Sequence, residues 1–288
     1  MIEKIARGAG RLFLVGMLCS TAIAPLSARN ESTTGVLVLA QGGNSRWIKI
    51  VKAAVKQADL PYPTRLFFGD CDTAREVHEL QEDVQDLESD GAHSIVVIPL
   101  LISPYSSIAR QWKYLLGVDF QPGFISNPSF PLERHSNIHF METLNDSAVV
   151  VEILLDRAQE LSEQPSKESV IVVSIGAADG SDNNHWIEIL KALCQRVKER
   201  GGFKSVEGFT LRDDAPSAAR LESMQALRDR ISAIDDSSSR ALVIPLVLYS
   251  SGLENRLGLE LRGLTYAFNT KTLLPDNRIA EWIRSQVP

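Results

Sequence analysis

The chain has 288 residues, of which 44% are hydrophobic and 23% charged, enough for one large globular domain or two of ordinary size. Its formal net charge is −6. This acidic balance gives no broad electrostatic attraction for nucleic acid or an anionic membrane surface, so we expect neither as a partner.

The first residues have the pattern of a secretory signal. Lys4, Arg7 and Arg11 precede the apolar run Leu12–Ile23, and small residues follow up to Ala28. The run is short for a membrane span, which favours a signal peptide over residues 1–28 with cleavage after Ala28. An uncleaved N-terminal anchor is the alternative. In either case we expect an exported protein, periplasmic or extracellular.

Cysteine use fits this location without demanding a disulfide. Cys19 lies inside the apolar run, which leaves Cys71 and Cys194, one in each half of the remaining chain. Export permits a bond between them, but nothing in their spacing requires one, so we expect two reduced thiols.

The first half alternates short apolar runs with longer segments of helical periodicity. Gly35–Ala40 and Thr64–Phe68 are typical of buried strands, and apolar residues recur at helical spacing over Trp47–Ala58. Trp47 falls on the apolar face of that helix, so we expect it in the core. The remaining elements expected in this half are a helix over Ala74–Ser89, a strand from Ser94, a helix over Ala109–Leu116, a strand over Ile138–Met141 and a helix over Ser147–Leu161.

The same pattern begins again after the polar linker Ser162–Ser169. Val170–Ser174 repeats the first strand, and Trp186 takes the place of Trp47 on the helix that follows. Alternating short strands and helices of this length predict right-handed crossovers, and therefore parallel sheets. Further elements expected are strands over Phe203–Leu211, Ala241–Leu248 and Leu264–Phe268 and helices over Ala215–Ile234 and Asp276–Gln286.

The duplication is clearest in one stretch, because the residue pattern of Ser94–Ile108 is repeated at Ala241–Leu253. Each copy is a nearly unbroken apolar run that ends in Pro, Leu and small polar residues, as in a strand buried on both faces. Parallel α/β sheets place ligands just beyond the carboxyl ends of their strands. The loops after Pro99 and Pro245 are therefore the first candidates for a binding site. The expected architecture is α/β, with two duplicated three-layer α/β/α lobes, at 35–162 and 168–288, each containing a four-stranded parallel sheet.

The motifs and their order along the chain resemble those of the sirohydrochlorin cobaltochelatase (CbiX-type) family of class II chelatases, in its long form of two fused copies. The resemblance covers most of residues 35–288. The segments that carry it are Leu39–Gly43, Val97–Ile102, Val243–Leu248, Ile138–Leu161 with Arg157 and Glu160, and Pro216–Ser217.

The resemblance implies a cleft between the lobes that holds a tetrapyrrole, while imidazoles present a divalent Co, Ni or Fe ion. In this sequence the family's histidine positions are occupied by Gln41, Ser107, Ile175 and Leu253. Two functions therefore stay open. One is a chelatase, a lyase, that binds a divalent metal, a tetrapyrrole or both; the other is a non-catalytic exported binding module that retains the fold.

Residues at the first turns are candidates for ligand binding. Gln41, Asn44 and Ser45 precede a helix N-terminus, which favours an anionic ligand, although a helix cap explains them equally. Asp70 and Asp72 follow the second strand, as Asp213 and Asp214 do in the second half. Paired carboxylates could hold a hard cation or accept ligand protons, or could cap helices.

The loops after the third strands match each other in composition. Tyrosine rings and hydroxyl groups suit stacking on, and hydrogen bonding to, a flat macrocycle or another small molecule. His185, with Asp182 nearby, is the one histidine expected near a ligand-facing loop of the second half, as a metal ligand or a surface residue. The remaining loop candidates are Tyr105, Ser106, Ser107, Tyr249, Ser250 and Glu254.

Overall fold

The computed structural model describes residues 33–123, 130–236, 239–249 and 252–288. The predicted signal at 1–28 and the candidate Ser250 lie outside these residues. Among the helices that are described, none combines the length and the apolar character needed to cross a membrane.

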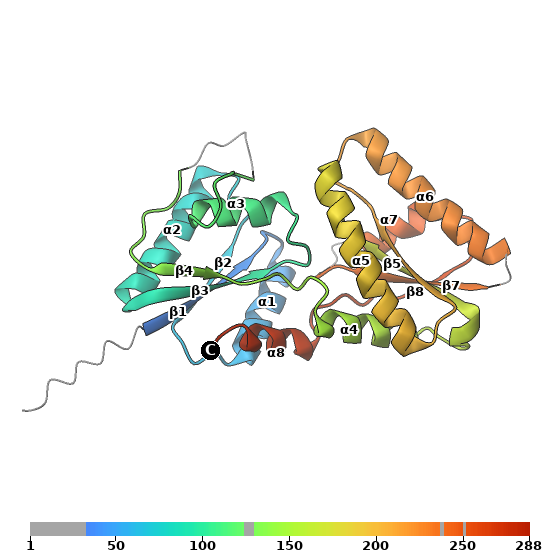
Figure 1. Cartoon of the computed structure of the whole chain (residues 1–288), viewed down its shortest axis with the longest axis horizontal. Coiled ribbons are helices and arrows are strands. Elements are labelled where there is room, and N and C mark those ends of the chain that lie inside the picture. Colours follow the sequence, from blue (N-terminus) through green and yellow to red (C-terminus); the bar gives the residue numbers. More distant parts are fainter. Residues whose placement is uncertain (1–32, 124–129, 237–238, 250–251) are drawn as a thin grey trace, which may run out of the picture. The chain divides into compact units, whose positions relative to one another are not determined.

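The first half contains a four-stranded parallel sheet in the order β2-β1-β3-β4 (Figure 1). The register pairs Ala40 with both Phe68 and Leu100, so three strands end at the same edge. The elements are β1 Thr33–Ala40, α1 Ser45–Ala58, β2 Thr64–Phe68, α2 Ala74–Ser89, β3 Ala92–Leu100, α3 Ser107–Leu115, β4 Asn137–Phe140 and α4 Ala148–Gln159.

The second half repeats this topology, with the order β6-β5-β7-β8 and parallel pairing throughout. Ser174 pairs with Thr210 and Leu246, which again aligns three carboxyl ends. The elements are the 3-10 turn η1 Pro165–Lys167, β5 Glu168–Ser174, α5 Gly180–Gly201, β6 Ser205–Thr210, α6 Ser217–Asp236, β7 Arg240–Leu246, α7 Leu253–Glu260, β8 Ala267–Phe268 and α8 Asn277–Ser285. The predicted duplicated α/β architecture is confirmed.

Alternating side chains of the central strands supply separate cores. Leu37 and Leu39 of β1 pack with α2 and α3, whereas Val36 and Val38 face the opposite side. That second side belongs to one continuous core, to which β1, β3, β5 and β7 and helices α1, α4, α5 and α8 all contribute. A further core lies between β5, β7, α6 and α7. The two inner strands of each sheet, β1 and β3 in the first and β5 and β7 in the second, are thus buried on both faces, as their unbroken apolar runs predict.

The last helix of each half packs against the other half. α4 contacts α5 and β7, and α8 contacts α1 (Figure 1). The C-terminus is held there by hydrogen bonds: Arg284 Nη1 donates to the Ala58 carbonyl at 3.2 Å, and the Tyr62 hydroxyl donates to the Pro288 carbonyl at 3.1 Å. This exchange ties the two halves into one packed body.

The structure corrects the prediction for the start of the first helix in the second half. His185 was expected on a loop, but it lies within α5, which begins at Gly180 and is capped by Asp179, whose side chain accepts from the Asp182 amide at 3.0 Å. Helix α7, which begins at Leu253, was not predicted at all. The two described cysteines are buried free thiols, as expected.

Candidate functional site

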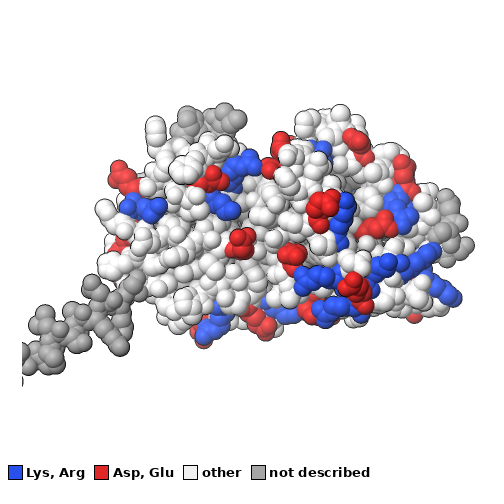
Figure 2. Space-filling view, in the orientation of Figure 1, with Lys and Arg blue, Asp and Glu red and all other residues white. Residues whose placement is uncertain are grey.

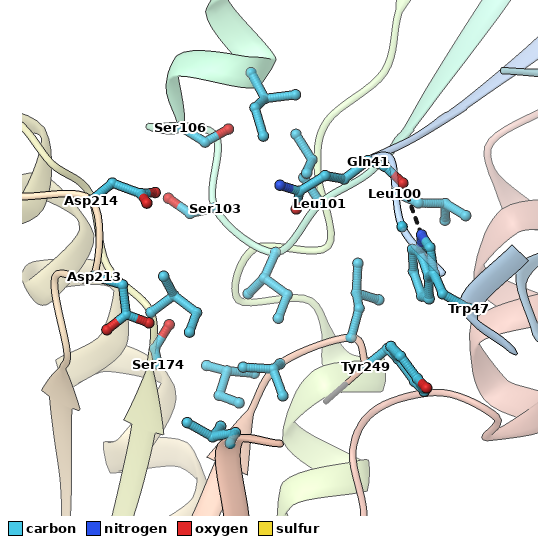
Figure 3. A pocket seen from close by; sticks show the side chains of 18 of the residues that line it. Gln41, Trp47, Leu100, Leu101, Ser103, Ser106, Ser174, Asp213, Asp214 and Tyr249 are labelled. Atoms are coloured by element: carbon cyan, nitrogen blue, oxygen red, sulfur yellow. Dashed lines mark hydrogen bonds between the residues drawn. The ribbon is translucent and has the colours of Figure 1, made fainter. Parts of the chain in front are cut away.

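A cavity of about 550 Å³ lies at the carboxyl ends of both sheets. Its wall combines the loops after β1, β3, β5, β6 and β7, which is where the parallel topology places ligands. Figure 3 shows apolar side chains in the middle, with Asp213, Asp214 and Ser174 on one side and Gln41, Trp47 and Tyr249 on the other. The apolar side chains that line it are Leu100, Leu101, Ile102, Ile108, Ile175, Leu246, Val247, Leu248 and Leu253.

Trp47 fixes the turn after β1. Its indole Nε1 donates to the Gln41 carbonyl at 2.8 Å, and the Asn44 side chain caps α1 by accepting from the Trp47 amide at 3.0 Å. A Cβ on Gly43 would lie 2.4 Å from the Trp47 ring, so only glycine fits there without displacing the indole. Asn44 therefore acts as a cap and also lines the cavity. Ser45 is the first residue of α1.

Asp70 supports the same turn from β2. Its carboxylate accepts from the Gly42 amide at 3.2 Å and from the Gln41 side-chain amide at 3.4 Å. Burial raises the pKa of Asp70 above its usual value; the two hydrogen bonds oppose the shift, and the charges of Asp72 and Asp214 add to it. Gln41 is thus held by a neighbouring carboxylate and lines the cavity.

The second half builds its equivalent turn differently. Trp186 donates to the Ser174 hydroxyl at 3.2 Å, and the Asn183 side chain accepts from the Ala177 amide at 3.2 Å. Gly176 has φ +81°, a conformation that other residues adopt only with strain, and a Cβ there would meet the Asn183 side chain. The turn presents Ile175 to the cavity. Both tryptophans are buried, as predicted.

Asp213 and Asp214 face the cavity from the loop after β6. Asp213 pairs with Arg256 of α7 at 2.8 Å, and Arg256 also lines the cavity. The Nε atom of Arg256 is buried and has no hydrogen-bond partner in the described part of the chain. Sequence reasoning missed this arginine because helix α7 itself was missed.

The candidates of the third-strand loops divide into two groups. Ser106 and Tyr249 line the cavity, and the Tyr249 ring stacks on Trp47 with centroids 5.6 Å apart. Tyr105 instead stacks on His185, at 5.5 Å. Ser107 is the first residue of α3, after the capping hydroxyl of Ser106, which accepts from the Ala109 amide at 3.0 Å.

The other candidates lie around the cavity rather than on its wall. Asp182 pairs with Arg110 of α3 at 2.5 Å, Asp72 is exposed near Glu76, and Glu254 lines a second cavity described below. Three of the four positions matched to family histidines, Gln41, Ile175 and Leu253, line the first cavity. Among the described residues, no group of three or more His, Cys, Asp or Glu side chains is arranged to hold a metal ion.

Comparisons with known proteins identify the fold. No protein-family model and no curated protein sequence matches the chain. The solved structures that resemble it include the following two. SirB from Bacillus subtilis with Fe3+ has a TM-score of 0.65 at 12% identity, covering 88% of this chain and 94% of that chain. DR2241 from Deinococcus radiodurans, a multi-domain protein with structural similarity to chelatases, has a TM-score of 0.55 at 12% identity, covering 88% of this chain and 55% of that chain.

These similarities concern the fold. Two four-stranded parallel sheets with flanking helices form an α/β fold like that of these two structures, which agrees with the fold that the sequence motifs imply. At 12% identity the likeness extends to the fold alone.

Proposed function

We propose that this protein binds a tetrapyrrole in the first cavity and does not insert a metal into it. The observation that carries the proposal is the replacement of imidazoles by Gln41, Ile175 and Leu253 on the wall of an otherwise well-formed cavity. A volume of about 550 Å³ is in the usual range of small-molecule sites, roughly 300–1,000 Å³.

The lining supports a flat apolar ligand with polar substituents. Leucine, isoleucine and valine side chains occupy the middle, and the Trp47–Tyr249 stack supplies aromatic surface at one side. Gln41, Arg256 and the two aspartates Asp213 and Asp214 offer hydrogen bonds at the edges. A macrocycle has this distribution of apolar and polar groups.

Metal insertion in this family depends on imidazoles, and among the described residues that line the first cavity there is no histidine. An imidazole nitrogen can take a divalent ion from water and release it again, whereas isoleucine and leucine offer no donor atom. The likeness to SirB with Fe3+ makes chelation the second candidate function, with Co, Ni or Fe as its metal. Residual chelation would have to use the carboxylates of Asp70 and Asp214 or the side chain of Gln41.

The test is a titration of the purified protein with sirohydrochlorin and related porphyrins, followed by the absorbance of the macrocycle. We expect saturable one-to-one binding, weakened at least about tenfold by Ile175→Arg, which fills the cavity and buries a charge. Leu259→Arg is the matched control, because Leu259 is exposed on α7 and should tolerate arginine without loss of binding. The absence of any absorbance shift in the wild-type protein would refute the proposal.

A second measurement separates the two functions. With Co(II) or Fe(II) added to the complex, we expect the metal to be inserted no faster than into the same macrocycle without protein. Faster insertion that is lost in Asp70→Asn would establish the chelatase instead. We further propose that the binding takes place outside the cytoplasm, which N-terminal sequencing of the protein from its native cell would test by finding cleavage after Ala28.

A further inference from the structure

A second cavity, of about 830 Å³, adjoins the first. Its wall comes from the start of α1, the end of α4, the start of α7 and the loop between β8 and α8. Tyr249 lines both cavities and therefore stands between them. In Figure 3 its ring lies beside Trp47 and its hydroxyl points away from the middle of the first cavity.

Basic side chains outnumber acidic ones on this second wall. The acidic residues are Glu254 and Asp276, and the basic ones are Arg46, Arg157, Lys271 and Arg278. Asp156 and Glu160, which pair with three of these cations, bring the number of nearby carboxylates to four. On the face drawn in Figure 2, basic and acidic side chains are interspersed.

Ion pairs hold three of these cations in place. Arg157 pairs with Asp276 at 3.2 Å, Arg278 pairs with Asp276 at 2.8 Å, and Lys271 pairs with Glu160 at 2.8 Å. Arg157 also pairs with Glu160 at 3.0 Å, and Arg278 also pairs with Asp156 at 2.7 Å. Each guanidinium therefore contacts two carboxylates and keeps only part of its five N–H donors for a ligand. The Nε atom of Arg157 is buried and has no hydrogen-bond partner among the residues that the structure describes.

Arg46 is the exception among the four. Within the described part of the chain, no carboxylate lies within ion-pairing distance of its guanidinium. It occupies the first turn of α1, where the helix dipole disfavours a positive charge. A cation in this position, exposed and directed to a cavity, is stabilised when an anion binds beside it.

We infer that the second cavity is the carboxylate-binding part of the ligand site. Arg46, Lys271 and Arg278 bind the acidic side arms of a ligand whose apolar body lies in the first cavity against Tyr249. This inference rests on the proposed function. It adds a ligand preference to it, because the ligand must carry carboxylates on the edge nearest Tyr249.

The test compares one porphyrin that carries carboxylate arms with the same porphyrin in which every carboxylate is a primary carboxamide. The dissociation constants are measured for the wild-type protein and for Arg46→Gln/Lys271→Gln. Lys49→Gln/Lys52→Gln is the control, because it removes the same charge from α1 positions outside both cavities. Titration with succinate by calorimetry distinguishes a free dicarboxylate from carboxylates attached to the macrocycle.

We expect the wild-type protein to bind the carboxylate porphyrin at least about tenfold more tightly than the carboxamide. The double variant should lose that preference while binding the carboxamide as before, and the control should keep it. Equal binding of both porphyrins by the wild-type protein, or a preference unchanged in the double variant, would overturn the inference and leave the proposed function standing. Tight binding of succinate without any preference between the porphyrins would also overturn it. Failure to bind either porphyrin would remove the proposed function as well.

Discussion

Arg110 and Asp182 join the two halves across the site: Arg110 Nη2 of α3 lies 2.5 Å from Asp182 Oδ2 of α5. Beside this pair, Tyr105 of the first half stacks on His185 of the second. These four residues, which we call the clasp, connect the loop after β3 and helix α3 to the first turns of α5. The clasp lies next to the first cavity, of which Ser103 and Ser106 are lining residues.

We expect Asp182→Asn to lower the free energy of unfolding by ~0.5–1 kcal/mol, because the ion pair is partly exposed and the carboxylate also favours the N-terminus of α5. Urea denaturation gives the free energies of unfolding of the wild-type protein, Arg110→Gln, Asp182→Asn and the double variant. Together these four values form a double-mutant cycle. Strict additivity of the two single changes would show that the pair contributes nothing.

The two tryptophans give a prediction that separates stability from binding. Trp47→Phe and Trp186→Phe each remove one indole hydrogen bond, to the Gln41 carbonyl and the Ser174 hydroxyl. Trp186→Phe should cost ~1–3 kcal/mol of unfolding free energy, the usual penalty for leaving a buried polar group without its partner, because Ser174 is buried. Trp47→Phe should cost less, because Gln41 is exposed and water can replace the indole as a donor. Only Trp47→Phe should also weaken macrocycle binding, since Trp47 lines the cavity and Trp186 does not. Equal losses of affinity in both variants would contradict this assignment.

Introducing two histidines into the wall of the first cavity should create metal binding. In Gln41→His the ring would lie beside Asp70, whose Oδ2 is 3.4 Å from the present side-chain amide nitrogen. A carboxylate that accepts from one ring nitrogen orients the other toward a metal. We expect Co(II) uptake by Gln41→His/Ile175→His that exceeds the wild-type level about tenfold or more, and loss of the gain when Asp70→Asn is added. Calorimetry with Co(II) measures both, and uptake that is insensitive to Asp70→Asn would place the ion elsewhere.

Asp83 should make stability depend on pH. Burial raises the pKa of this α2 carboxyl to about 6, with Arg65 opposing the shift and Asp86, Glu79 and Glu82 adding to it. The folded pKa exceeds the unfolded value of 3.8, so the folded state prefers the protonated form, and stability is lost as the pH rises through about 6.

Asp83→Asn removes this effect. Relative to the wild-type protein, the variant should gain ~1–2 kcal/mol of unfolding free energy between pH 4 and pH 8, a value reduced from the full shift because the side chain is only half-buried. Chemical denaturation at both pH values measures the difference. A stability difference that is the same at pH 4 and pH 8 would contradict the prediction.

Most of the fold was predictable from local patterns. Thr64–Phe68 and Ala74–Ser89 have the bounds that sequence periodicity gives them, and the apolar runs of β3 and β7 predict strands buried on both faces. Helix α7 lacked a signal because Gly252 precedes it with no side-chain cap and Gly258 interrupts its short pattern. The early start of α5 was hidden because Gly180–His185 contains no apolar residue, although the Asp179 cap marks it.

The site was predictable only in part. The loops of Gln41, Ser106 and Tyr249 follow from where parallel strands end. The packing of α8 on α1 leaves no local trace in the sequence, since it joins segments more than 200 residues apart, and with it the second cavity was unforeseen. Arg46 looked like an ordinary helix residue until the fold brought it beside Lys271 and Arg278.

The position of a bound macrocycle tests the central claim most directly. A crystal structure of the protein with a porphyrin that carries carboxylate arms should show the ring in the first cavity, in contact with Ile175 and Tyr249, with no protein side chain bound to its centre. Density for the ring at any other surface, or a metal held over the ring by side chains of this chain, would contradict the account.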